Sequence, residues 1–149
     1  HPKMKWLETV EAQEDNVLSF NQATTLINKH GDELKGIFGM TSVATPASAE
    51  AVTQASKCGT IAVVGLATPN AMKPYVEKDC VKSVVLWNPV DLGYAAMQVL
   101  RAVADGDLKP GATSVKAGKL GELQVINGSE ILLGAPFVFS KENIGQFDF

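Results

Sequence analysis

The chain has 149 residues, of which 46% are hydrophobic and 19% are charged, and its formal net charge is −3. This size and composition indicate one ordinary globular domain with a real core, and they argue against disorder and against a coiled coil. The lysines form no basic stripe with interleaved aromatic residues, so nucleic acid is not an expected partner. No apolar run approaches the roughly 20 residues of a membrane span, and residues 1–5 do not resemble a secretory signal.

The first part of the sequence alternates between strand-like and helix-like segments. In chain order it predicts a strand at 6–10, a helix at 21–30, a strand at 36–40, a helix at 46–56, a strand at 61–66, a helix at 69–78 and a strand at 83–87. The strands are mostly continuous apolar runs, which is typical of strands covered on both faces. We therefore expect an α/β fold, built on a parallel sheet with helices on both faces.

Two copies of one tripeptide mark the turns that lead into helices. Ala44-Thr45-Pro46 and Ala67-Thr68-Pro69 each follow an apolar, glycine-containing strand. Threonine is a good N-cap and proline is tolerated at the first helical position, so we expect Thr45 and Thr68 to cap the two helices. In a doubly wound sheet these turns lie at the carboxyl ends of the strands, which is where such folds bind ligands.

The last third of the sequence follows a different pattern. Residues 90–105 predict the longest helix, with an apolar stripe that must be buried against something. The stripe consists of Leu92, Ala95, Ala96, Val99, Leu100 and Val103. Residues 115–134 contain short strand-like pieces, and Asn127-Gly128 is a strong hairpin-turn signal. Three aromatic residues in the last eleven positions predict a tail that docks on a surface.

The sequence contains no catalytic constellation. Its only histidines are His1 and His30, and His30 is explained by its place at a helix C-terminus. Two cysteines are too few for a structural zinc site. Gly39 and Gly65, which end two strands, are weak evidence for phosphate binding without a GxGxxG or GKS/T loop. We therefore expect no enzyme activity, no metal and no cofactor.

Three segments resemble a known family. They are AVVGLATPNAMKPYV (62–76), SVVLWNPVDLGYAAMQVLRAVADGDLKPG (83–111) and FSKENIGQFDF (139–149). Together they resemble the carboxyl-terminal half of type I periplasmic sugar-binding proteins of ABC importers, in the group that binds rhamnose and autoinducer-2. The resemblance implies a receptor with two α/β lobes that close on a sugar and then dock on a membrane permease.

The same resemblance implies a division of the chain. Residues 1–88 would form most of the second, C-terminal lobe, and residues 89–149 would supply a crossover helix, a hairpin-rich segment and a tail that complete the two lobes. Most of the first lobe has no counterpart here, so the missing first lobe and an ABC permease are the expected partners besides the sugar. The expected location is the periplasm, although this chain carries no signal peptide.

The resemblance also points to candidate ligand residues after three strands. They are Met40, Thr41 and Ser42 at the end of the strand at 36–40, Thr68 after the strand at 61–66, and Trp87 and Asn88 at the hinge strand, 83–87. An indole face suits a sugar ring, and an amide offers both a donor and an acceptor. A core position for Trp87 and backbone capping by Asn88 are equally open interpretations.

The likeness leaves the ligand open. Rhamnose, or a similar deoxy-hexose or pentose, is the expected sugar, and an autoinducer-2 receptor is the alternative within the family. Autoinducer-2-binding members have a proline and an alanine where this chain has Met40 and Ser42. An effector domain of a LacI-type regulator is the alternative from another class, and it would require an upstream helix-turn-helix.

A periplasmic location makes the two cysteines a disulfide candidate, because proteins fold there under oxidising conditions. Cys58 and Cys80 each precede a predicted strand, at the amino-terminal edge of the sheet. The strand order of the family makes these two strands neighbours, so the Cα atoms could approach the roughly 5.5 Å that a disulfide needs. Two free thiols are the alternative.

Overall fold

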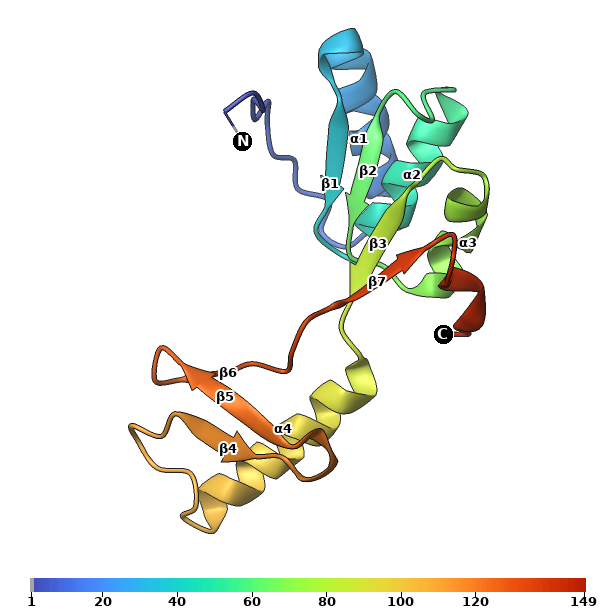
Figure 1. Ribbon diagram of the computed structural model, residues 1–149. Coiled ribbons are helices and arrows are strands. Elements are labelled where there is room, and N and C mark those ends of the chain that lie inside the picture. Colours follow the sequence, from blue (N-terminus) through green and yellow to red (C-terminus); the bar gives the residue numbers. More distant parts are fainter. Residues whose placement is uncertain (1) are drawn as a thin grey trace. The chain divides into compact units, whose positions relative to one another are not determined.

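The computed structural model describes residues 2–149 (Figure 1). The chain forms two compact units, each described here by itself. The first unit contains the residues up to Leu86 and the C-terminal segment Val138–Phe149, and the second contains Trp87–Phe137. The family resemblance predicts a lobe boundary near residue 88. The chain leaves the first unit after Leu86, two residues earlier.

Residues 2–149 form four helices and seven strands. The helices are α1 (Asn16–His30), α2 (Ala44–Gln54), α3 (Pro69–Glu77) and α4 (Pro89–Ala104). The strands are β1 (Gly36–Gly39), β2 (Ala62–Gly65), β3 (Ser83–Leu86), β4 (Ser114–Lys116), β5 (Glu122–Ile126), β6 (Glu130–Ile131) and β7 (Phe137–Ser140). Short 3-10 turns lie at Gly31–Glu33, Gly118–Leu120 and Ile144–Gln146.

In the sheet of the first unit, the strands β1, β2 and β3 run parallel. β1 pairs with β2 in parallel, in a register that runs from Gly36↔Ala62 to Gly39↔Gly65. A parallel bridge between Leu66 and Val85 joins this pair to β3, and β7 lies beside β3 (Figure 1). The predicted α/β fold with a parallel sheet is therefore confirmed.

Burial alternates along the strands, so the described residues cover one face of the sheet. Ile37, Val63 and Val84 are buried in one core with residues of α1, α2 and α3. Their neighbours Phe38 and Val64 point to the opposite face, where they are 62% and 37% exposed. The continuous apolar runs in the sequence predicted that both faces of the sheet are covered. Within residues 2–149, nothing covers the face that carries Phe38 and Val64.

The predicted strand at 6–10 is wrong. Residues 4–12 are irregular, because no described strand lies beside them to complete a ladder, and Trp6 is 72% exposed. Ion pairs hold this segment to the helix instead: the Glu8 carboxylate accepts from Lys29 Nζ at 2.8 Å and lies 2.5 Å from His30 Nε2. These contacts, led by the hydrogen bond from Lys29, lower the pKa of Glu8.

Two helices begin earlier than the sequence pattern indicated. α1 begins at Asn16, five residues before the predicted start, because Asp15 is its N-cap and the Asp15 carboxylate accepts from the Leu18 N–H at 2.7 Å. α3 begins at Pro69 as expected and continues through Pro74 to Glu77. α2 begins at Ala44, so Thr45 lies inside its first turn and is not its cap.

The second unit packs α4 against an antiparallel sheet. β4 pairs with β5, and β5 pairs with β6 through the predicted turn at Asn127-Gly128, where both residues have positive φ. Of the expected apolar stripe, Ala95 is buried in this core and Val99 is partly buried. Leu92, Leu100 and Val103 remain exposed, at 46%, 63% and 56%.

The C-terminal tail docks on the first unit, as predicted. Phe139 is 1% exposed and meets the rings of Phe147 and Phe149 edge to face, with centroids 4.8 and 6.2 Å away. The start of α3 holds the tail, since the Asn70 N–H donates to the Phe149 carbonyl at 3.1 Å and Lys73 Nζ donates to the Phe147 carbonyl.

Candidate functional site

The candidate site is the edge of the sheet at which β1 and β2 end. Because Gly39 pairs with Gly65 in a parallel register, residues 40–42 and 66–68 leave the sheet at the same edge. The helices α2 and α3 begin from these two loops (Figure 1). Loops at the carboxyl ends of parallel strands are the usual place for a ligand in such folds.

The start of α2 packs closely against the ends of β1 and β2, and the sequence did not predict this contact. Thr45 is fully buried, and its hydroxyl lies 3.1 Å from the Gly39 carbonyl and 3.0 Å from the Thr41 carbonyl. A Cβ on Gly39 would overlap Thr45, with the Thr45 Cα only 2.6 Å away, and a Cβ on Gly65 would overlap the Gly39 carbonyl. The glycine that ends each strand was the available signal, since only glycine permits this approach of helix to sheet.

Thr41 lies two residues before Val43, the N-cap residue of α2, and supplies the side-chain hydrogen bonds at the start of this helix. Its hydroxyl oxygen accepts from the Ala44 N–H at 3.1 Å and from the Val43 N–H at 3.4 Å, so it satisfies amides that have no partner within the helix. Thr45 is therefore free to turn inward, which explains why the expected cap at Thr45 is wrong. The hydroxyl of Thr41 is occupied by this structural role.

Ser42 and Thr68 keep their hydroxyl groups free of protein partners. Thr68 stands at the N-cap position of α3, but its side chain makes no capping hydrogen bond. Within residues 2–149, neither hydroxyl hydrogen-bonds to the protein. Ser42 is exposed, Thr68 is half-buried, and both therefore retain a donor and acceptors for a ligand.

The other candidate ligand residues differ in their exposure and in the hydrogen bonds that they already make within the protein. Met40 is 68% exposed, directly after β1. Trp87 follows β3 and is 40% exposed, so it is not a core residue among the parts described. Asn88 caps α4, because its side-chain oxygen accepts from the Val90 N–H at 3.0 Å and the Asp91 N–H at 3.3 Å. Its amide nitrogen remains available, so capping leaves a donor free.

A shallow groove borders the first loop on the helical side. Ser42 and Val43 line it together with Phe20 of α1, Glu50 of α2 and Tyr75 of α3. The Tyr75 hydroxyl donates to the Glu50 carboxylate at 3.0 Å. Burial, followed by this hydrogen bond, raises the pKa of Tyr75 to about 12. Hydrogen bonds from Gln54 and then Tyr75 lower the pKa of Glu50, so Glu50 is ionised and Tyr75 is neutral at neutral pH.

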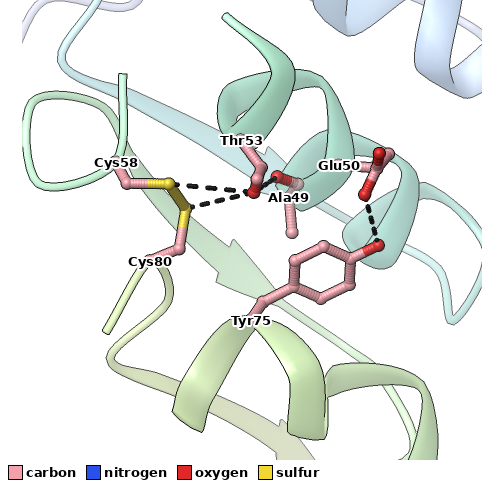
Figure 2. The surroundings of a disulfide bond; sticks show 6 residues. All are labelled: Ala49, Glu50, Thr53, Cys58, Tyr75 and Cys80. Carbon is pink, nitrogen blue, oxygen red and sulfur yellow. Dashed lines mark hydrogen bonds between the residues drawn. A yellow bond between two sulfur atoms is a disulfide. The ribbon is translucent and has the colours of Figure 1, made fainter. Parts of the chain in front are cut away.

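Cys58 and Cys80 form a disulfide at the amino-terminal edge of the sheet, away from the candidate site. Their Cα atoms are 4.6 Å apart, and the bridge links the loop after α2 to the loop after α3. Figure 2 shows Thr53 of α2 facing both sulfur atoms, and it shows the hydrogen bond that joins Glu50 of α2 to Tyr75 of α3. The disulfide expected from the sequence is thus present in the structure.

Two further observations concern metal ligands and membrane spans. Residues 2–149 contain no group of three or more histidine, cysteine, aspartate or glutamate side chains placed to hold a metal ion. Within the same range, no helix is both long enough and apolar enough to cross a membrane.

Comparisons with known proteins agree with this architecture. Residues 1–108 match the family model described as a periplasmic binding protein domain. The crystal structure of a sugar ABC transporter from Actinomyces odontolyticus is 32% identical, with a TM-score of 0.77, and the match covers 94% of this chain and 45% of that one.

Two other solved structures match with the same fold. A solute-binding protein from Clostridium phytofermentas with bound L-rhamnose is 25% identical, with a TM-score of 0.78 over 91% of this chain and 46% of that one. LsrB from Clostridium saccharobutylicum in complex with AI-2 is 21% identical, with a TM-score of 0.78 over 93% of this chain and 47% of that one, and at this identity it supports the fold alone.

The chain spans less than half the length of each of these three proteins. The match to the family model nevertheless extends over well more than half of the present sequence. The parallel sheet, the helices that start at its carboxyl edge and this match lead to one conclusion: the chain belongs to the periplasmic binding protein family and carries part of its type I fold.

Proposed function

We propose that the protein is the solute-binding component of an ABC importer and binds a neutral sugar, L-rhamnose or a similar deoxy-hexose or pentose. Family membership supports a solute-binding role without catalysis. The sugar ABC transporter from Actinomyces odontolyticus and the L-rhamnose complex, at 32% and 25% identity, support the choice of ligand class.

The observation that carries the proposal is the pair of unoccupied hydroxyls at one sheet edge. Ser42 and Thr68 follow neighbouring strands in register, and both hydroxyls are free of protein partners within residues 2–149. Hydroxyl groups offer donors and acceptors without charge, which suits a neutral polyol better than an anion. Met40 adds an exposed apolar side chain that can lie against the C–H groups of a deoxy sugar.

The remaining ligand residues are proposals that follow from their place in the sequence. Thr41 contributes by shaping the first loop, since its hydroxyl is used in capping. Trp87 offers an exposed indole for stacking on the sugar, and Asn88 offers its amide N–H groups. In this proposal residues 1–88 are most of one lobe, residues 89–149 complete the two lobes, and a first lobe supplies the opposite wall of the cleft.

The wider role follows from the same proposal. The loaded receptor would deliver its sugar to a membrane permease, and it would work in the periplasm. The periplasmic binding protein family supports that location.

Calorimetry with a longer form that restores the upstream coding sequence tests this function. We expect that form to bind L-rhamnose with a micromolar or tighter Kd, and the 149-residue chain to bind no better than millimolar, a gap of at least about 4 kcal/mol. Equal affinities would contradict the idea that half of the site lies outside this chain. Binding of autoinducer-2 in place of rhamnose, or an upstream helix-turn-helix, would overturn the proposed function.

A pair of threonine variants tests the site itself. In the longer form, Thr68→Val keeps the side-chain shape but removes the free hydroxyl, so rhamnose affinity should fall about tenfold, the effect of one lost hydrogen bond. Thr60→Val is the matched control, because Thr60 is exposed at the opposite end of β2. Equal affinities of the two variants would remove Thr68 from the site.

A further inference from the structure

The disulfide between Cys58 and Cys80 has one accessible and one protected sulfur. Cys58 is exposed and lies in the turn between α2 and β2, where Ser56 and Gly59 have positive φ. Cys80 is 6% exposed and lies against the core. A thiol in solution can therefore approach the bond only from the side of Cys58.

Thr53 lies beside both sulfur atoms. Its hydroxyl oxygen is 3.4 Å from Cys80 Sγ and 3.7 Å from Cys58 Sγ (Figure 2). The same hydroxyl donates to the Ala49 carbonyl at 2.7 Å, so its lone pairs are available to the sulfurs. If the bond opens, a Cys80 thiol can donate to this hydroxyl, and the hydroxyl can rotate away from the Ala49 carbonyl to donate to a Cys80 thiolate. The buried sulfur therefore keeps a polar partner, which avoids the cost of an unpaired buried group.

The two turns that carry the cysteines are held by backbone hydrogen bonds as well. The Lys57 N–H donates to the Val52 carbonyl, and the Cys80 N–H donates to the Tyr75 carbonyl at 2.9 Å. The Tyr75–Glu50 hydrogen bond still joins α3 to α2. Opening the disulfide would therefore leave both turns and the contact between the helices in place.

We infer that Cys58–Cys80 is a thiol–disulfide exchange site of the folded protein, at which a dithiol reductant attacks Cys58 and Cys80 leaves next to Thr53. The reductant thiolate forms a bond to Cys58 Sγ, the Cys58–Cys80 bond breaks, and its electron pair goes to Cys80 Sγ, which then takes up a proton. The second thiolate of the reductant displaces Cys58, which is also protonated. The reductant gives up two electrons and two protons and leaves as a disulfide.

The first test locates the attack. The oxidised 149-residue protein is treated with reduced glutathione as the trapping thiol, quenched with acid, alkylated and digested, and its peptides are measured by mass spectrometry. We expect glutathione on Cys58 and the alkyl group on Cys80 under native conditions, and a nearly equal distribution in denaturant. Glutathione mainly on Cys80, or an equal distribution in the native protein, would overturn the inference.

The second test measures the rate of reduction by dithiothreitol in the native protein. Thr53→Val should react about tenfold more slowly than the wild type because the leaving sulfur loses its hydrogen bond, whereas Thr53→Ser should retain most of the rate. Thr25→Val is the control, since Thr25 makes the same bond to the carbonyl four residues earlier, at Asn21, on the exposed surface of α1. In denaturant all four proteins should react alike.

Equal native rates for Thr53→Val and Thr25→Val would remove Thr53 from the site. Circular dichroism of the reduced protein completes the test, because a spectrum of the unfolded chain would show that exchange does not take place in the folded state. None of these measurements involves a sugar, so their outcome is independent of the proposed transport function.

Discussion

Single residues at the end of β1 decide whether α2 can reach the sheet. Gly39 touches the Thr45 backbone so closely that any side chain would displace the first turn of α2. The displaced turn contains Thr45 and directly follows the loop that carries Thr41 and Ser42, so the packing of one glycine determines where the candidate ligand residues lie. This coupling connects local backbone geometry to the site.

Gly39→Ala should therefore destabilise the protein by about 3 kcal/mol or more, because the overlap involves backbone atoms that cannot rotate away. Gly93→Ala is the matched control, since nothing lies within 4 Å of its new Cβ and Gly93 is in the exposed interior of α4. The control should gain about 0.5–1 kcal/mol from helix propensity. Urea unfolding measures both changes, and a neutral Gly39→Ala would show that the junction can relax.

Tyr75 gives the protein a predictable response to alkaline pH. Its pKa is raised to about 12 in the folded protein, mainly by burial and then by the Glu50 hydrogen bond. An unfolded tyrosine loses its proton near pH 10, so this contribution is fully present below about pH 10 and is lost as the pH rises through 12. The wild type should therefore lose more stability than Tyr75→Phe between pH 9 and 11.5, in denaturant titrations at matched ionic strength. Parallel losses would contradict the assignment.

At the scale of elements, the sequence predicts the helices and strands whose residue pattern directly reflects which of their side chains are buried. The segments that became β1, β2 and β3 are apolar because one of their faces is buried, and Asn127-Gly128 suits only a tight turn. Residues 6–10 also predict a strand through Trp6, Leu7 and Val10, but a strand needs a neighbour, which a local sequence cannot supply. The start of α2 was misplaced because Thr45 and Thr41 are both plausible caps, and only the packing against Gly39 selects between them.

The position of the candidate site was predictable for the same reason. Loops after parallel strands must lie at one edge, so Ser42 and Thr68 could be expected there. The free state of their hydroxyls could not be predicted, because it depends on which threonine caps which helix. The sequence pattern also could not predict what covers the second face of the sheet, because an apolar run does not specify which part of a protein packs against it.

The disulfide joins two elements that are separated in sequence, and its removal should destabilise the protein by about 3 kcal/mol. The bridge closes a loop with a sequence separation of 22, and this estimate follows from the entropy that the closed loop removes from the unfolded chain. The double variant Cys58→Ser with Cys80→Ser, compared with the oxidised protein in urea, measures it. A thiol titration of the denatured, unreduced protein gives the control, and two titratable thiols per chain would contradict the bridge.

At the scale of the whole molecule, both units expose apolar side chains that a soluble monomer normally covers. Phe38, Met40 and Val64 lie exposed on the first unit, at 62%, 68% and 37%. On the second unit Met97 and Leu100 of α4 are 66% and 63% exposed. Large exposed apolar side chains that gather on one surface mark an interaction site. In the proposed function, this surface is covered by lobe elements that lie outside the present chain.

The 149-residue chain should therefore associate with itself when those elements are absent. We expect sedimentation velocity to show dimers or larger species whose fraction rises with protein concentration, because apolar contact removes this surface from water. Leu100→Glu should reduce the association, whereas Ala104→Glu adds the same charge at an exposed position of α4 with little apolar surface to lose. A strictly monomeric profile at high concentration would mean that these side chains tolerate water, and it would weaken the argument that a further lobe covers them.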